Sequence, residues 1–282
     1  VPREPVAITS DHEYRHTEVA VVGGGPAGMS AALAAAESGA RVTLVDDQPT
    51  LGGHLLYDSC TRIDARDLDT ESGQQSSRSL AQRIESNEDI EIIGDATAFG
   101  LYEGKLLGIN QGSSMIRLRA NSVVVATGSY ETPLTFDRND LPGVMMATAA
   151  QRLIQRYAVA PCDTCVVLTA NDEGYRAALD YAEADIRVAA VVDMRAETPP
   201  NALTQELLAR GVQLIPNAHV DEARAKRGHL ASVVIHSNDQ TVVQEIVCDS
   251  LMMSIGWAPA GSLVYQAGAV SYTHLRAHET RH

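Results

Sequence analysis

The feature that most constrains the fold is a glycine-rich turn between a buried strand and a helix. Val19–Val22 is a short apolar run typical of a strand covered on both faces, and Met29–Glu37 is rich in alanine, the strongest helix former. Arg41–Val45 predicts a second strand after the helix. The turn itself reads Gly23-x-Gly25-x-x-Gly28. The segment therefore predicts a complete βαβ unit of the dinucleotide-binding type.

Each glycine of this turn has its own mechanical reason. Gly23 permits the tight turn, Gly25 lets the backbone approach a pyrophosphate, and Gly28 allows the helix to pack closely on the strand. The unpaired N–H groups and the positive dipole end of the helix then favour an anion without any basic side chain. We therefore expect these three residues to bind a dinucleotide.

An acidic residue follows at the spacing that ribose recognition requires. Asp46 stands 18 positions after Gly28, where a carboxylate accepts hydrogen bonds from a ribose 2′-OH. A 2′-phosphate would be repelled, so NAD or FAD is favoured over NADP. Asp47 follows directly and is the alternative, although the strand pattern ends at Asp46.

Two further segments are candidates to line the cofactor. Gly52 and Gly53 come just after the acidic strand end, where a glycine pair either lets a loop pass close to the cofactor or makes an ordinary turn. Ser122–Tyr130 predicts another buried strand that runs into Thr127 and Gly128. Such a strand end presents its backbone at the carboxyl edge of a parallel sheet, where open α/β folds bind ligands.

The second half of the chain repeats the order of the first. Cys165–Ala170 predicts a strand, Glu173–Ala184 a helix, and Val188–Val192 another strand. The turn between them lacks the first two glycines, and Asp172 and Glu173 would repel a pyrophosphate. We interpret this half as a Rossmann-like domain that has lost nucleotide binding.

The predicted fold class is α/β, with a Rossmann-like FAD/NAD(P)-binding domain and a second, inserted Rossmann-like domain. A turn-rich stretch after the Thr127-Gly128 strand end carries the chain into the insertion, and Leu251–Ile255 is predicted as the strand that completes the first domain. The expected divisions are an N-terminal lead at 1–17, a cofactor domain at 18–145 plus 246–269, a second domain at 146–245, and a non-native tail at 270–282.

Composition excludes several classes of partner. The formal net charge is -14 and the chain has only two lysines, so no concentrated positive surface for nucleic acid is expected. The longest uncharged stretch, Val19–Ala36, contains the glycine turn and therefore does not predict a membrane span. Four cysteines do not make a disulfide scaffold in a chain of 282 residues, which favours a reducing, cytoplasmic location.

Two local motifs suggest other chemistries. H-E-x-x-H occurs at 12–16 and at 278–282, but the first string runs into a strand and zinc chemistry needs a helix, so we expect no metal site. Cys162 and Cys165 form a C-x-x-C pair, which is the basis of an alternative function as a pyridine nucleotide-disulfide reductase. Buried structural cysteines are the simpler reading of that pair.

Longer phrases carry a family resemblance. They are GGGPAG, LVDDQPTLGGHLL, ATGSYETPLTFDRNDLPGVMMATAAQRLIQRYAVAP and CDSLMMSIGWAPAGSLVYQAGA. Over roughly 11–269 the chain resembles the alpha subunits of heterotetrameric sarcosine oxidases, within the glutathione reductase type of two-dinucleotide-domain flavoprotein. Those alpha subunits start earlier and continue much further, so the resemblance implies that this chain is an internal fragment.

The resemblance implies a subunit of an oxidase complex that demethylates sarcosine to glycine and forms H2O2. It also implies a small amine substrate, other subunits as partners, FMN or FAD in a partner subunit, and NAD or FAD in this chain. By position, Gly52, Gly53, Thr127, Gly128 and Gly256 match loops that line the dinucleotide. No catalytic residue is identified, and a non-catalytic, nucleotide-binding structural subunit is a further alternative.

Overall fold

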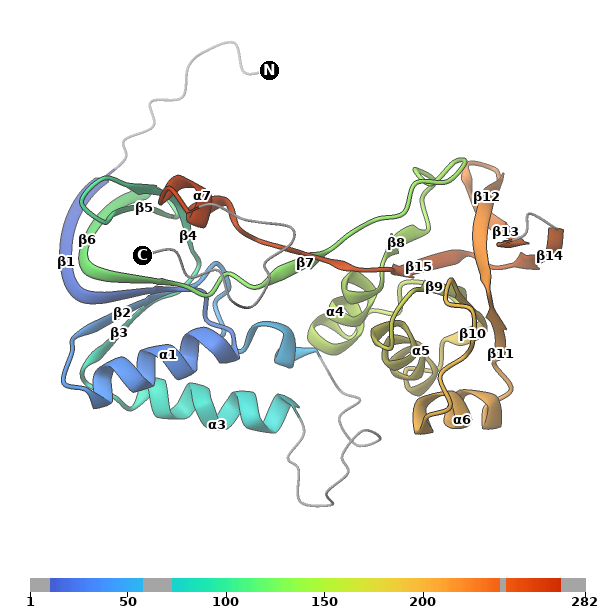
Figure 1. The fold of residues 1–282 in the computed structure, drawn as a ribbon, viewed down its shortest axis with the longest axis horizontal. Helices are drawn as coiled ribbons and strands as arrows, with labels where there is room; N and C mark the ends of the chain where they lie inside the picture. Colours follow the sequence, from blue (N-terminus) through green and yellow to red (C-terminus); the bar gives the residue numbers. More distant parts are fainter. Residues whose placement is uncertain (1–10, 58–72, 239–241, 270–282) are drawn as a thin grey trace, which may run out of the picture. The chain divides into compact units, whose positions relative to one another are not determined.

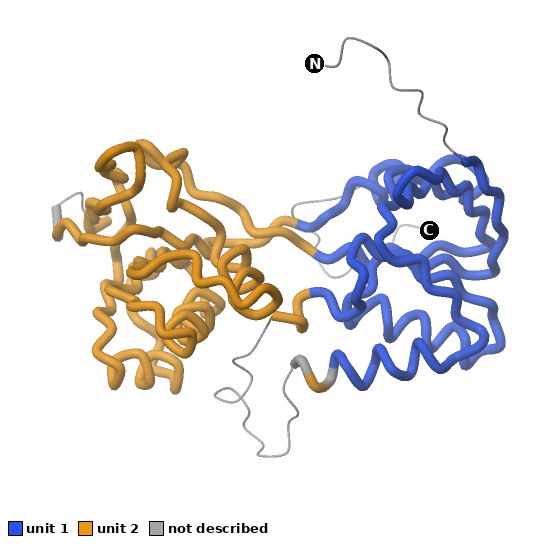
Figure 2. The backbone as a smooth tube through the Cα atoms, turned by 180° about the vertical axis from the view of Figure 1, so that it is seen from behind, with its two compact units in different colours: residues 1–53, 77–128, 259–282 blue, residues 54–76, 129–258 orange. Residues whose placement is uncertain are grey.

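The computed structural model describes residues 11–57, 73–238 and 242–269, and it divides the chain into two compact units. The first unit contains residues 1–53, 77–128 and 259–282, and the second contains 54–76 and 129–258 (Figure 2). The second unit is thus an insertion in the first. The predicted α/β class with an inserted Rossmann-like domain is confirmed.

The first unit is built on a six-stranded sheet in the order β3-β2-β1-β6-β5-β4. Strands β1, β2, β3 and β6 pair in parallel, whereas β5 runs antiparallel to both β4 and β6. The strands are β1 (Asp11–Val22), β2 (Val42–Val45), β3 (Ile90–Ile93), β4 (Ala96–Tyr102), β5 (Leu106–Gln111) and β6 (Ser114–Val125).

Helices cover one face of the parallel strands in this unit, and the antiparallel strands lie over the other (Figure 1). The helices are α1 (Pro26–Glu37) and α3 (Gly73–Glu85), with a short α7 (Ser262–Gln266) on the opposite face. Because alternate residues of a strand face opposite sides, Val21 packs against α1 while Val22 packs against β5 and α7.

The second unit has a parallel sheet in the order β11-β10-β9-β15-β8 and a separate antiparallel sheet, β12-β13-β14. Its strands are β8 (Val144–Met146), β9 (Thr164–Thr169), β10 (Arg187–Asp193), β11 (Gln213–Pro216), β12 (Ala218–Lys226), β13 (His229–Ser237), β14 (Val242–Val247) and β15 (Ser250–Ser254). Its helices are α4 (Ala147–Tyr157), α5 (Glu173–Glu183) and α6 (Ala202–Ala209).

This unit has the same three layers as the first. Cys165 and Val167 of β9 pack against the helices, whereas Val166 and Leu168 pack against the antiparallel sheet. Strand β9 therefore contributes to two cores at once, which is why its sequence is continuously apolar instead of alternating.

The predicted boundaries of the two domains differ from these units. The segment predicted as the final strand of the cofactor domain is β15, and it pairs with β9 and β8 inside the second unit. The chain returns to the first unit only after β16 (Trp257–Pro259), which pairs with β7 (Ser129–Glu131). The local pattern predicted a buried parallel strand correctly, but it does not specify which sheet receives the strand.

Other local predictions are settled by the same topology. Ile90–Ile93 extends the parallel part of the first unit's sheet as β3. Residues 12–16 lie within β1, so the first H-E-x-x-H string forms no helix, while the second string and the predicted tail at 270–282 lie outside the described residues. Among the described helices, none is both long and apolar enough to span a bilayer.

Candidate functional site

Gly23 forms the tight turn at the carboxyl end of β1. Its φ is +112°, a conformation that side-chain-bearing residues rarely adopt, and an added Cβ would lie 2.7 Å from the carbonyl carbon of Ala126. Its N–H donates to the Val45 carbonyl at 2.8 Å. Gly23 is therefore required by the crossing of three backbone segments, with no ligand needed to explain it.

Gly25 and Gly28 stand on the first turn of α1 but meet different surroundings. A Cβ on Gly28 would collide with the carbonyl of Gly23, whose carbon would lie 2.9 Å away. A Cβ on Gly25 would meet only the Gly53 Cα, at 3.9 Å. Gly28 therefore serves helix packing, whereas the protein leaves the space above Gly25 open.

Asp46 is fixed against the glycine turn. Its side chain accepts hydrogen bonds from the N–H of Gly24 and, at 2.8 Å, from the N–H of Gln48. Asp47 is exposed, and its carboxylate accepts from the side-chain amide of Gln48 at 3.2 Å. Between the two candidate acids, the geometry favours Asp46, because only its carboxylate adjoins the turn.

Gly52 and Gly53 bring their loop against the same turn. The Gly52 N–H donates to the Gly24 carbonyl at 2.8 Å. Gly53 has a φ of +55°, and a Cβ there would lie 2.9 Å from the Gly25 Cα. The glycine pair therefore allows close passage of two backbones, and its predicted contact with the cofactor stays a prediction.

Thr127 and Gly128 lie at the carboxyl edge of the same sheet. The Ala126 N–H just before them donates to the Val22 carbonyl at 2.8 Å, which holds this segment beside the end of β1. The Thr127 hydroxyl donates to the Ala260 carbonyl at 2.6 Å. Gly256, in contrast, belongs to the second unit, where its carbonyl accepts the Thr132 N–H at 2.9 Å.

The corresponding turn of the second unit is filled by its own side chains. Thr169 takes the place of the first glycine and is fully buried. Its hydroxyl donates to the Ser254 carbonyl at 2.9 Å and accepts the Asn171 N–H at 3.1 Å. Gly174 keeps the third position, where a Cβ would lie 3.1 Å from the Thr169 Cγ2. This turn has retained helix packing and lost the open space.

Asp193, the acid at the end of β10, makes contacts that hold the second unit together. Asp193 is fully buried and accepts from the Tyr175 hydroxyl at 2.8 Å and from Arg195 at 2.8 Å. Arg195 also pairs with Asp172 at 2.7 Å, and these carboxylates raise the pKa of its guanidinium. Asp193 is therefore held by side chains of its own unit, whereas Asp46 accepts from backbone N–H groups.

The Cys162–Cys165 pair lies at the amino end of β9. Cys165 is fully buried in the helix-facing core. A hydrogen bond between the two thiols lowers the pKa of Cys162 and raises that of Cys165, with burial adding to the rise at Cys165. Thr169, at the carboxyl end of the strand, is four residues or about 13 Å further along β9. The pair is therefore at the opposite end of β9 from the residues that line the unit's cavity.

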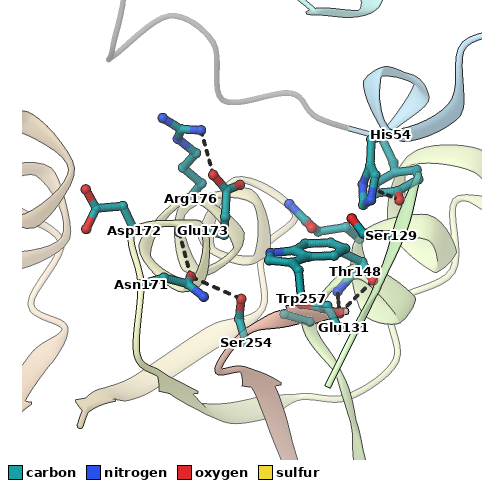
Figure 3. Close-up of a pocket in the computed structure, with 13 residues that line it drawn as sticks. His54, Ser129, Glu131, Thr148, Asn171, Asp172, Glu173, Arg176, Ser254 and Trp257 are labelled. Carbon is teal, nitrogen blue, oxygen red and sulfur yellow. Dashed lines mark hydrogen bonds and ion pairs between the residues drawn. The ribbon is translucent and has the colours of Figure 1, made fainter. Parts of the chain in front are cut away.

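The second unit contains a cavity of about 450 Å³ that the sequence analysis did not find (Figure 3). Glu131 and Trp257 line it, together with Asn171 and Ser254 from the carboxyl ends of the sheet and Thr148 from α4. Burial raises the pKa of Glu131, although hydrogen bonds from Thr148 oppose the rise. Glu131 stands in a turn-rich stretch with no motif, and Trp257 belongs to no motif of known chemistry, so no local signal marks this cavity.

A three-layer Rossmann-like fold with a glycine turn, a helix N-terminus and an acid at one sheet edge defines a dinucleotide-binding protein. A family model described as pyridine nucleotide-disulphide oxidoreductase matches residues 17–277, and the chain belongs to that family. Dinucleotide binding, of FAD or NAD, is the property that fold, site and family share. The matched range extends into the segment that the sequence analysis had set aside as a tail.

Among curated proteins, the chain is similar to the sarcosine oxidase subunit alpha of Rhizobium meliloti (strain 1021), with 32% identity over 272 residues. The match covers 92% of this chain and 26% of that protein. The resemblance stated from the sequence is therefore confirmed, and the chain spans about a quarter of the length of the relative.

Two solved structures show the same fold. L-proline dehydrogenase from P. horikoshii matches with a TM-score of 0.72 and 22% identity, covering 93% of this chain and 46% of that one. Thioredoxin reductase from T. acidophilum matches with a TM-score of 0.70 and 21% identity, covering 88% and 80%. At these identities the similarity concerns the fold alone.

Proposed function

We propose that this chain is the dinucleotide-binding part of the alpha subunit of a multi-subunit flavoprotein that oxidises a small amine. The proposed reaction of the whole complex is the oxidative demethylation of sarcosine to glycine with formation of H2O2. The similarity to sarcosine oxidase subunit alpha supports this proposal. The chemistry is assigned to a partner subunit carrying FMN or FAD, because no described residue here forms an evident catalytic group.

The observation that carries the proposal is the open space above Gly25. The residues proposed to hold the NAD or FAD are Gly23, Gly25, Gly28, Asp46, Gly52, Gly53, Thr127, Gly128 and Gly256. The first turn of α1 contains no acidic residue, so its N–H groups can hold a pyrophosphate without repulsion. Asp46 would accept hydrogen bonds from the ribose 2′-OH. Such a dinucleotide would supply hydride-transfer or electron-transfer chemistry to the complex.

Gly25→Val tests this site. The new side chain would occupy the space of the pyrophosphate, while the nearest protein atom at Cβ distance is the Gly53 Cα at 3.9 Å, so the fold should tolerate it. We expect cofactor content to fall to about one tenth of wild type or less. The measurement is chromatography of the supernatant after denaturation, which also tells FAD from NAD.

Ser30→Val is the matched control, because it adds the same side chain to an exposed position further along α1. Equal cofactor content in Gly25→Val and in this control would refute the placement of the site. If the wild-type protein released neither FAD nor NAD, the proposed cofactor itself would be wrong.

The alternative function in disulfide reduction depends on Cys162 and Cys165. Cys162 has a lowered pKa, which favours a reactive thiolate, but Cys165 is inaccessible in the core. Alkylation of the accessible thiol should leave oxidase activity of the complex intact. Loss of activity on alkylation would favour the disulfide reductase instead.

Free thiols at Cys162, Cys165 and Cys248 also support our proposal of a reducing, cytoplasmic location.

A further inference from the structure

The cavity of the second unit lies where open α/β sheets place their ligands. Strands β9, β10 and β11 follow one another in one direction from β9, and β15 lies on its other side. The crevice between β9 and β15 is thus the topological switch point of this sheet. Asn171 and Ser254, at the carboxyl ends of these two strands, both line the cavity.

Glu131 presents an unsatisfied oxygen in this cavity. The side chain is only 7% exposed, and its Oε2 accepts from the Thr148 N–H at 2.9 Å and the Thr148 hydroxyl at 2.6 Å. Among the described residues, Oε1 accepts no hydrogen bond; the Ser254 hydroxyl lies close enough to lower the pKa of Glu131, but it donates to the Asn171 side chain at 3.4 Å. A buried carboxylate oxygen without a donor is costly, so a donor from a ligand would stabilise it.

The other charges around the cavity are already paired. Glu173 pairs with Arg176 at 2.9 Å, and Asp172 pairs with Arg195 at 2.7 Å. The guanidinium of Arg152 attracts Glu131 electrostatically, but its hydrogen bond goes to the Tyr57 hydroxyl at 3.2 Å, and it lies 4.9 Å from that ring's centre. Arg152 thus lowers the pKa of Glu131 without a recorded hydrogen bond to it, and Oε1 is left to accept from a ligand.

The aromatic side chain of Trp257 lines the cavity together with this carboxylate. Trp257 lines the cavity beside Glu131 (Figure 3), and its ring is held edge-on by His54 with a centroid distance of 4.6 Å. Indole is the best aromatic partner for a cation. A carboxylate with a free oxygen next to an indole face is a combination suited to an ammonium group with attached carbon.

We propose that this cavity binds a small protonated amine, primary or secondary, whose N–H donates to Glu131 Oε1 and whose alkyl groups lie against Trp257. The pyrophosphate of a dinucleotide is excluded here, since Thr169 fills the turn and Asp172 and Glu173 flank it. This proposal stands on the second unit alone and does not depend on the cofactor proposed for the first.

Trp257 is the single tryptophan of the chain, so tryptophan fluorescence reports on the surroundings of this one residue, beside Glu131. The experiment titrates the 282-residue chain with dimethylammonium chloride at neutral pH, against sodium chloride at matched ionic strength. We expect a saturable change with dimethylammonium and none with sodium. Calorimetry of the same titration provides a second signal, and the absence of both signals would overturn the proposal.

Two comparisons test the role of Glu131. Glu131→Gln keeps an acceptor for Thr148 but removes the charge, so dimethylammonium should bind about tenfold more weakly or worse. Glu197→Gln, an exposed carboxylate of the same unit, should bind as wild type does. Tetramethylammonium has the charge without an N–H and should bind more weakly than dimethylammonium. Equal affinity of the Glu131→Gln variant, with an unchanged circular dichroism spectrum, would sink the assignment.

Discussion

The two units show the same three-layer plan with and without an open nucleotide turn. In both, a strand leads through a six-residue turn to a helix, and the third glycine position is kept as Gly28 or Gly174. The first position differs, because Gly23 lies against the backbone of Ala126 with no room for a side chain, whereas Thr169 places a buried side chain there. The glycines of one motif therefore meet different demands. Gly23 and Gly28 are required by close backbone contacts, and only Gly25 leaves an open space.

The acids at the two strand ends show the same division. Asp193 is fully buried against Arg195 and Tyr175, whereas Asp46 is half-buried and accepts from two N–H groups of the turn and loop. A carboxylate at this position can therefore be held by buried side chains or by the backbone of the turn, and ligand binding is proposed only for the second arrangement. Substitutions at matched positions in the two units can test whether these roles are as distinct as the contacts indicate.

The largest effect is expected at Gly28. Gly28→Ala places a Cβ against the Gly23 carbonyl, and neither backbone can move without breaking the hydrogen bond from Gly23 to Val45. We expect a loss of about 3 kcal/mol or more in the free energy of unfolding. The measurement is urea titration of the variant and the wild type, followed by circular dichroism.

The matched substitution in the second unit sharpens this prediction. Gly174→Ala meets the side chain of Thr169 instead of a backbone carbonyl, so Thr169→Gly should rescue it in the double variant. No substitution elsewhere should rescue Gly28→Ala in this way. A Gly28→Ala protein with wild-type stability, or a double variant no better than Gly174→Ala, would contradict the account.

A smaller effect is expected from the two acids, and of a different kind in each unit. Asp193→Asn weakens charged hydrogen bonds in a buried site and should cost about 2 kcal/mol of stability without loss of cofactor. Asp46→Asn should lower cofactor content with little loss of stability, because an amide oxygen still accepts one N–H. Cofactor analysis and thermal melting of both variants check this, and the reverse pattern would refute the division of roles.

The smallest effect concerns pH. Burial raises the pKa of Glu131 above its ordinary value of 4.5, so the folded state binds a proton more tightly than the unfolded state. The raised pKa therefore contributes stability to the folded state. This contribution is complete at pH values below 4.5 and is lost as the pH rises through the folded-state pKa. Relative to Glu131→Gln, the wild-type melting temperature should fall by about 2 °C between low and neutral pH. If the melting temperatures of the two proteins differed by the same amount at low and at neutral pH, the pKa of Glu131 would not be raised in the folded state.

The first unit's turn could be predicted because its signals are local. Gly28 is required by the backbone of Gly23 within the motif, and Asp46 follows the next strand, so their spacing locates them; the Ala126 backbone that requires Gly23 is distant in sequence. The predicted contact of Gly52 and Gly53 with the cofactor remains a prediction, although their contact with the turn is now seen.

The second unit was less predictable because its decisive contacts are long-range. Strand β15 pairs with β9, more than eighty residues earlier. The apolar sequence of β15 does not indicate which strand it pairs with. Glu131 is buried only because α4 and Trp257 come together around it. Gly256 was grouped with the cofactor loops by resemblance, but the structure assigns it to this unit.

The insertion of one unit in the other also sets an order of synthesis. Leu263 of α7 closes one core of the first unit, and Gln266 accepts the Leu101 N–H at 2.8 Å. Both residues leave the ribosome after every residue of the second unit. The first unit therefore starts earliest and is completed last, and its apolar core stays open while the inserted unit is being made.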